Sequence, residues 1–314
     1  MKALQQIIER VAENPAQPWA FATLVQTQGS TYRKAGARLL VDPDGGTLGV
    51  LSGGCLEEEI GRQGRNVILD GSPLLLSFDT RQLYGCDGRL KILVEPLPAA
   101  GKNGNLITNI GRSLGNRETC RVRTCFEGET LGSDLLPADV FLAERRGVFI
   151  DTLQLPIRLL LFGTGPEIEP ITQLAKALGW VVERFGHPFE LGQDFRSDIQ
   201  TAAVVMNHNF GRDLLSLHRL LPMHLRYVGL LGPKKRHAEI LTQLSEYVPF
   251  EFNGALNNFF APAGLDIGSE APEEIALSIV AEVEAVLSGR VGGFLRERGA
   301  NIPTTATTAS GEAA

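Results

Sequence analysis

The sequence predicts an α/β protein with two domains, the second of which is built on a mainly parallel sheet. Its length of 314 residues suits about two domains at ~100–200 residues each. Residues 157–162 (IRLLLF) form a continuous apolar run, which is typical of a strand buried on both faces. A glycine turn, a helical stretch over residues 167–178 and another β-rich run over residues 180–185 follow. Strand, turn, helix and strand within ~30 residues make a βαβ unit, which indicates a Rossmann-like domain.

The first domain is expected over residues 1–98, with mixed α/β structure. Residues 2–13 place apolar side chains at helical spacing, and Asn14-Pro15 ends this opening helix. A second helix should follow Cys55 and run to about Leu69. Strands are expected at residues 19–26, 38–41, 47–51, 74–78 and 90–95. Residues 99–155 should form a connecting β-rich region, which either completes the first domain or bridges the two domains.

The Rossmann-like domain is expected over residues 156–290. After the βαβ unit the sequence continues to alternate, with strands at 202–206 and 227–231 and helices at 213–221, 234–244 and 272–287. Residues 291–314 should be a flexible tail, because the last fourteen residues are small and polar.

Composition excludes several classes of function. A net charge of −6 argues against nucleic-acid binding, which requires clustered lysine and arginine. Four cysteines are too few for a disulfide scaffold, and their spacing does not support a zinc site. The N-terminal residues lack a secretory pattern, and no apolar run approaches the ~18 residues of a membrane span. A cytoplasmic protein that binds neither nucleic acid nor membrane is expected.

The stretch around Cys55 is the first candidate site. An apolar run leads into Ser52-Gly53-Gly54, then Cys55, then a helix that begins with three glutamates. Helix N-terminal N–H groups would favour a reactive thiolate at Cys55, whereas the glutamates would oppose it. A buried and inert cysteine is the alternative, and the local pattern leaves both interpretations open.

The connection over residues 28–38 is the second candidate. It carries three cations, Arg33, Lys34 and Arg38, between glycines and hydroxyl residues. Such a segment is either a solvated surface loop or an anion site made of backbone N–H groups and cationic side chains.

Strand ends of the second domain supply further candidates. Gly163 and Gly165 form a G-x-G turn before a helix, but Ile168 replaces the third glycine and Gly186 stands where a ribose-binding acid is expected. An NAD(P)-dependent oxidoreductase that uses this βαβ unit is the alternative function, and the missing acid at Gly186 argues against it. His208 follows the strand at 202–206, and ligands of open α/β sheets bind at such ends, although a histidine there more often has a structural, hydrogen-bonding role.

Taken together, these motifs resemble those of the XdhC/CoxI family, the accessory proteins that mature xanthine dehydrogenase and related molybdenum hydroxylases. The similarity spans nearly the whole chain. It rests on the segments Gly29–Arg38, Ser52–Glu57, Gly85–Gly88, Leu161–Pro166, Tyr227–Pro233 and Gly264–Gly268. Gly186 and Phe260 depart from the family pattern, which often has an acid and a histidine at these two positions.

The resemblance implies binding of the molybdenum cofactor (Mo-molybdopterin), help in its sulfuration by a cysteine desulfurase, and delivery to an apo xanthine dehydrogenase-type hydroxylase. Cys55 would ligate molybdenum or carry a persulfide, and the protein would act as a chaperone rather than as an enzyme with turnover. A homodimer is expected from base rates. The expected cofactor-binding residues are Arg33, Lys34, Arg38, Gly53, Gly54, Cys55, Cys86, Gly163, Gly165 and His208.

Overall fold

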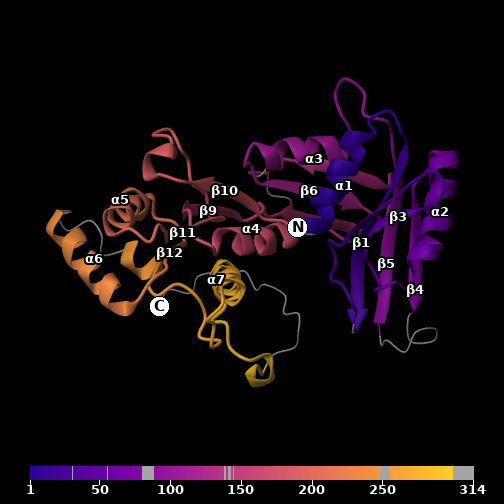
Figure 1. Cartoon of the computed structure of the whole chain (residues 1–314). Coiled ribbons are helices and arrows are strands. Elements are labelled where there is room, and N and C mark those ends of the chain that lie inside the picture. The colour runs from indigo at the N-terminus through magenta and orange to yellow at the C-terminus, as the bar shows by residue number, and fades with distance from the viewer. Residues whose placement is uncertain are drawn as a thin grey trace. The chain divides into compact units, whose positions relative to one another are not determined.

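The computed structural model divides the chain into two compact units (Figure 1). The first comprises Met1–Ile157 and Leu178–Val181, and the second comprises Arg158–Ala177 and the chain from Val182 onward. The residues that the structure describes are 1–29, 31–54, 56–79, 88–137, 139–140, 143, 145–247 and 255–299. The predicted domain limits at 98, 155 and 290 stay predictions.

An antiparallel sheet of five strands forms the first unit, in the order β3-β2-β1-β5-β4. Its strands are β1 (Trp19–Gly29), β2 (Arg38–Val41), β3 (Thr47–Gly49), β4 (Leu74–Asp79) and β5 (Gly88–Leu97). Side chains alternate between the two faces of the sheet. Helix α2 (Glu57–Asp70) covers one face, where Ile60 packs into a cluster with Leu39 and Ile92.

The other face of this sheet is buried by two helices and a smaller sheet. Helices α1 (Lys2–Glu13) and α3 (Leu106–Gly115) contribute Ile7 and Ile110 to a core that also holds Phe21. The smaller sheet is antiparallel and has the order β7-β6-β8. Its strands are β6 (Cys120–Cys125), β7 (Gly132–Leu136) and β8 (Val148–Leu153).

Helix α3 corrects one expectation, because a β-rich region was predicted over residues 99–155. Ile107, Ile110 and Leu114 lie at helical spacing and are buried. A capping box starts the helix: the backbone N–H of Thr108 donates to the Asn105 side chain at 3.0 Å, and the Asn105 N–H donates to the Thr108 hydroxyl at 2.7 Å. The prediction overlooked this capping signal.

The second unit contains the predicted parallel sheet, in the order β10-β9-β11-β12-β13, and this prediction is confirmed. Its strands are β9 (Arg158–Gly163), β10 (Val181–Phe185), β11 (Thr201–Met206), β12 (Tyr227–Leu230) and β13 (Phe259–Phe260). Its helices are α4 (Ile168–Ala177), α5 (Phe210–Leu220), α6 (Lys234–Tyr247) and α7 (Pro272–Leu287). Short 3₁₀ turns lie at Pro188–Glu190, Leu221–Met223, Ala255–Asn258 and Leu295–Glu297. Leu160 and Val205 from the strands pack with Leu217 and Ile240 from α5 and α6.

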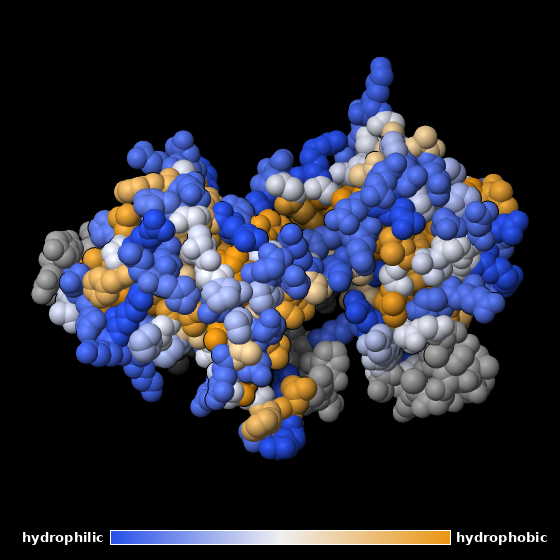
Figure 2. All heavy atoms as spheres, in the orientation of Figure 1, coloured by the Kyte–Doolittle hydropathy of each residue, from blue (hydrophilic) through white to orange (hydrophobic). Residues whose placement is uncertain are grey.

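Hydrophilic residues cover much of the face shown in Figure 2, and apolar residues appear there in separate patches. Large apolar side chains that are exposed include Leu69, Phe189 and Val291, which come from distant parts of the chain. Such scattered exposure is ordinary for a protein surface. None of the helices in the part of the chain that the structure describes is both long and apolar enough to cross a membrane.

Glycines set how closely α2 lies on its sheet, and this spacing can be tested at Gly61. A methyl group at Gly61 would overlap the carbonyl oxygen of Gly45. We expect Gly61→Ala to lower the free energy of unfolding by about 1–3 kcal/mol, as overpacking does, in urea titrations. Gly115→Ala is the matched control, because no described atom lies within 4 Å of that Cβ position at the end of α3. This variant should keep or raise stability; equal losses in both variants would contradict the packing argument.

Candidate functional site

The turn between β3 and α2 is organised by the carboxylate of Glu57. One oxygen, Oε1, accepts hydrogen bonds from the backbone N–H groups of Leu51 at 2.9 Å and Ser52 at 2.8 Å. The other, Oε2, accepts from the Ser52 hydroxyl at 2.5 Å, the Gly54 N–H at 3.0 Å and the Leu56 N–H at 3.1 Å. A single buried side chain therefore holds the turn on both sides of position 55.

These hydrogen bonds keep Glu57 ionised. Burial acts to raise the pKa of Glu57, but the bonds from the Ser52 hydroxyl and the Ser52 and Leu51 N–H groups outweigh it and lower the pKa to about 2. Glu57 is only 9% exposed, so its charge is stabilised by donors of the turn.

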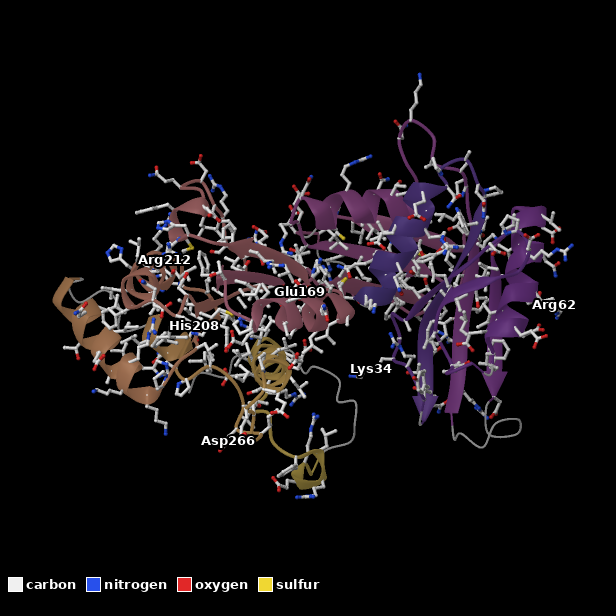
Figure 3. The ribbon with its side chains drawn as sticks, viewed as in Figure 1. Lys34, Arg62, Glu169, His208, Arg212 and Asp266 are labelled. Carbon is white, nitrogen blue, oxygen red and sulfur yellow. The ribbon has the colours of Figure 1, made fainter. Side chains whose placement is uncertain are left out.

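The three glutamates that begin α2 differ in their surroundings. Glu57 is inside the turn, Glu58 is exposed, and Glu59 accepts two hydrogen bonds from Arg62 at 2.9 and 2.7 Å on the helix surface (Figure 3). From the sequence they were interpreted as one block of negative charge. In the structure, Glu57 alone of the three accepts the hydrogen bonds of the turn. The sequence did not single it out, because acids are common in the first turn of a helix.

The structure brings this turn against the cationic loop. Ring atoms of Tyr32 lie 3.5 Å from the position that a Cβ of Gly53 would occupy. Gly53 and Gly54 have φ values of +83° and +111°, which glycine adopts readily. The exposed side chains of Arg33 and Lys34 follow Tyr32 in the loop, and Lys34 is labelled in Figure 3. Two stretches that were separate candidates in the sequence are therefore neighbours.

Arg38 has a different environment from the other two cations. It lies on β2 with 8% exposure, and its Nη1 donates to the Gly36 carbonyl at 2.9 Å and to the Asp151 carboxylate at 2.7 Å. Its Nε and Nη2 atoms are buried and have no hydrogen-bond partner among the residues described. Arg38 thus anchors the end of the loop, and its role as a phosphate ligand stays a prediction.

Cys55 and Cys86 lie outside the described residues. Of the cysteines that the structure does describe, Cys120 is buried, and burial raises the pKa of its thiol. Cys125 is partly exposed. No group of three or more histidine, cysteine, aspartate or glutamate side chains within the described ranges could hold a metal ion.

Strand register places further motif segments at the same end of the five-stranded sheet. Gly29, the last residue of β1, pairs with Gly88, the first residue of β5. Asp79, the last residue of β4, pairs with Arg89. Both β1 and β4 end at the lower edge of this unit in Figure 1. The cationic loop therefore leaves the sheet at the end where β4 ends and β5 begins.

In the second unit the predicted residues Gly163, Gly165 and His208 come together. Strand β9 has β10 on one side and β11 on the other, so the chain reverses direction across the sheet at this point, which is where open α/β sheets bind ligands. Gly163 ends β9 and pairs with Met206 of β11. A Cβ at Gly165 would lie 2.6 Å from the His208 Nε2 atom.

The carboxylate of Glu167 lies next to the G-x-G turn and gives it an acidic neighbour. Its Oε2 atom is 3.4 Å from the Nε2 atom of His208, and it would lie 2.6 Å from a Cβ at Gly165. Glu167 is 7% exposed. A carboxylate beside this turn disfavours the phosphates of a dinucleotide by charge repulsion, which argues against the NAD(P) alternative. In the sequence, Glu167 was predicted only as the start of a helix.

The end of β11 is also held by a buried acid. Asp213 is fully buried, and its Oδ1 accepts from the backbone N–H and side-chain Nδ2 of Asn207, each at 3.0 Å. Arg236 forms an ion pair with the other oxygen of Asp213. The exposed cations Lys234 and Lys235 precede Arg236 at the start of α6. Acids of the protein therefore neutralise part of the positive charge at these strand ends.

Models of known protein families match parts of both units. A model described as XdhC and CoxI family matches residues 13–79, and one described as XdhC Rossmann domain matches residues 159–283. A Bacillus subtilis protein, named as a probable subunit of xanthine dehydrogenase, is 26% identical over 309 residues, covering 83% of this chain and 91% of its own. The Escherichia coli molybdenum cofactor insertion chaperone PaoD is 26% identical over 274 residues, covering 84% of this chain and 82% of its own.

A solved structure shares the fold. The crystal structure of a xanthine dehydrogenase from Bacillus halodurans superimposes with a TM-score of 0.75 over 93% of this chain and 97% of that chain. At 24% sequence identity this likeness concerns the fold alone.

The Glu57 network predicts a specific loss of stability. In Glu57→Gln, an amide has one accepting oxygen, and its NH₂ group would face N–H donors. We expect the free energy of unfolding to fall by about 2–4 kcal/mol in urea titrations, because buried donors lose their partner. Glu58→Gln, an exposed neighbour, should change it by less than about 0.5 kcal/mol. Similar effects of the two substitutions would show that the network does not hold the turn.

The same carboxylate predicts a dependence on pH. Its pKa is about 2 in the folded chain against an ordinary value of 4.5, so the folded state favours the ionised form. The stabilisation is complete above the ordinary value and is lost as the pH falls from 4.5 toward 2. The stability difference between wild type and Glu57→Gln, measured by urea titration, should therefore shrink between pH 5 and pH 3. A difference that stays constant over this range would contradict the low pKa.

Proposed function

The chain belongs to the XdhC and CoxI family, and on that premise we propose that its first unit binds the molybdenum cofactor and delivers it to an apo molybdenum hydroxylase of the xanthine dehydrogenase type. The observation that carries this proposal is the contact between the Glu57-held turn and the cationic loop. The relatives named for xanthine dehydrogenase and for cofactor insertion support it.

The residues at the turn fit a cofactor with a metal end and a phosphate end. No described atom lies within 4 Å of the position that a Cβ of Gly54 would take, so the backbone there is open to close approach. Cys55 follows this opening, and thiolates are suitable ligands for soft metal centres. Arg33 and Lys34 are exposed cations that suit a phosphate. When bound, the cofactor supplies the redox-active molybdenum centre that the target enzyme requires.

Each protein group then has a distinct task. Glu57 fixes the turn on both sides of Cys55, and the thiolate of Cys55 holds either the metal end or a sulfur atom. In the second case Cys55 attacks the terminal sulfur of a desulfurase persulfide, the donor S–S bond breaks, and the donor cysteine leaves as a thiolate. We propose Cys86 as a second cofactor-binding cysteine.

The second unit is included in the proposal as a separate ligand site at Gly163, Gly165 and His208. The Glu167 carboxylate next to His208 favours a ligand group that donates hydrogen bonds, such as a hydroxyl. No observation in this unit favours hydride transfer, so the oxidoreductase alternative is not proposed.

The proposal predicts that cofactor retention depends on Cys55. Protein produced in a host that makes the cofactor should retain molybdenum and pterin through gel filtration. Cys55→Ala should retain at least ~10-fold less molybdenum, the loss typical when a metal site loses one supporting group. The matched control is Cys125→Ala, which changes a cysteine on the smaller sheet of the same unit.

Two outcomes would overturn these assignments. Wild-type protein that carries neither molybdenum nor pterin, and does not restore activity to an apo-hydroxylase when loaded, would refute the cofactor function. Normal retention by Cys55→Ala would refute the role of Cys55 alone.

A further inference from the structure

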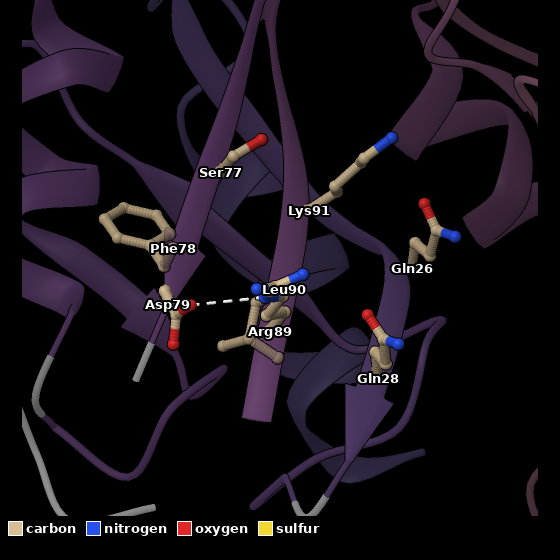
Figure 4. Close-up of a pocket in the computed structure, with 8 residues that line it drawn as sticks. All are labelled: Gln26, Gln28, Ser77, Phe78, Asp79, Arg89, Leu90 and Lys91. Carbon is tan, nitrogen blue, oxygen red and sulfur yellow. Dashed lines mark hydrogen bonds and ion pairs between the residues drawn. The ribbon is translucent and has the colours of Figure 1, made fainter. Parts of the chain in front are cut away.

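The first unit has a hollow that none of the predicted site residues lines. Its volume is about 380 Å³, within the range of small-ligand sites. It lies across three neighbouring strands, β1, β5 and β4 (Figure 4). Its lining residues are Gln26, Gln28, Ser77, Phe78, Asp79, Arg89, Leu90 and Lys91.

Strand register arranges six of these polar side chains as two rows across the sheet. Lys91 pairs with Gln26 on one side and Ser77 on the other. Arg89 pairs with Gln28 and Asp79 in the next row toward the strand ends. Cross-strand partners share a face of the sheet, so both rows present their side chains to the same side.

A register shift in β1 turns the side chains of Gln26 and Gln28 toward the hollow. Leu24 pairs with Ile92, and both belong to the core under α2. The register then skips Val25, so that Gln26 pairs with Lys91 on the opposite face. Such bulges redirect side chains next to functional sites. Without it, the alternation along β1 would turn Gln26 and Gln28 toward α2.

Arg89 is the cation best placed for an anion in this hollow. Its Nε atom forms an ion pair with Asp79 at 3.2 Å, and its side chain is 58% exposed. Its two Nη groups have no hydrogen-bond partner within the described parts of the chain. Lys91 is engaged with Glu127 at 2.8 Å. A guanidinium with both Nη groups available can bind a phosphate through two parallel hydrogen bonds.

The two glutamines suit a flat heterocycle. Gln26 and Gln28 line the hollow, lie two residues apart on one strand, and are thus roughly 7 Å apart along it. Each amide both donates and accepts hydrogen bonds. This combination complements a ring edge that alternates amino and carbonyl groups, as amide side chains do with nucleobase edges.

We propose that the hollow binds a 2-amino-4-oxopyrimidine ring that carries a phosphate, with Gln26 and Gln28 on the ring edge and Arg89 on the phosphate. Two compounds share this chemistry, the pterin of the molybdenum cofactor and a guanine nucleotide. The pterin assignment rests on the proposed function and gives the phosphate of the cofactor to Arg89 in place of Arg33 and Lys34. It is supported by position, because the rows end beside the Gly29–Gly88 pair, where the cationic loop leaves the sheet.

The test compares Arg89→Gln and Gln28→Ala with Arg62→Gln. Arg62 is a matched control, since its side chain is 63% exposed and ion-paired with Glu59 on α2. Pterin and molybdenum per chain are measured on protein from a cofactor-producing host, and GMP binding is measured by calorimetry on cofactor-free protein. Both hollow variants should lower pterin content about tenfold, because each loses a ligand hydrogen bond. Arg62→Gln should not change it, and thermal unfolding should be similar in all three.

The outcomes separate this proposal from the proposed function. If the wild type retains pterin and neither hollow variant loses it, the hollow is not the binding site, and the proposed cofactor function still stands. If wild type carries no pterin but binds GMP in an Arg89-dependent way, the hollow is a nucleotide site and the cofactor function fails. The absence of both pterin and GMP binding would overturn both.

Discussion

The first unit depends on one constraint: the N–H groups around the Ser52-Gly53-Gly54 turn need a partner, and Glu57 is that partner. Its carboxylate accepts from Leu51, Ser52, Gly54 and Leu56. These are the groups that would otherwise favour an anion or a thiolate at the start of α2. Because Glu57 already engages them, a reactive Cys55 would need activation by a ligand or by nearby cations, and a phosphate would have to bind elsewhere.

In the second unit, carboxylates likewise lie beside the backbone of the Gly163–Gly165 turn and of the loop after β11. Glu167 lies against Gly165, and Asp213 accepts from the backbone after β11, so acids of the protein occupy places where dinucleotide-binding folds hold phosphate. A G-x-G motif read from sequence alone therefore overstates the affinity of this turn for anions.

The sequence predicted the elements well where the signal is local. Apolar runs and helical spacing predict β9, α4 and α7, whereas α3 was missed because the Asn105 cap was overlooked. Two site features depend on long-range contacts and could not be predicted. The packing of Tyr32 on Gly53 joins residues far apart in the chain, and the hollow depends on a register shift within β1.

Ion pairing of the site cations also suits a carrier, which must release what it binds. Arg89 and Lys91 are partnered by Asp79 and Glu127, and Arg38 by Asp151. A phosphate on the Nη groups of Arg89 stays next to the Asp79 carboxylate, so the net gain is smaller than for an unpaired cation. When the ligand leaves, Arg89 keeps its ion pair with Asp79, and no unpaired charge remains at the site. Moderate affinity of this kind suits a carrier, whereas a catalytic site that keeps its cofactor would be better served by unpaired cations.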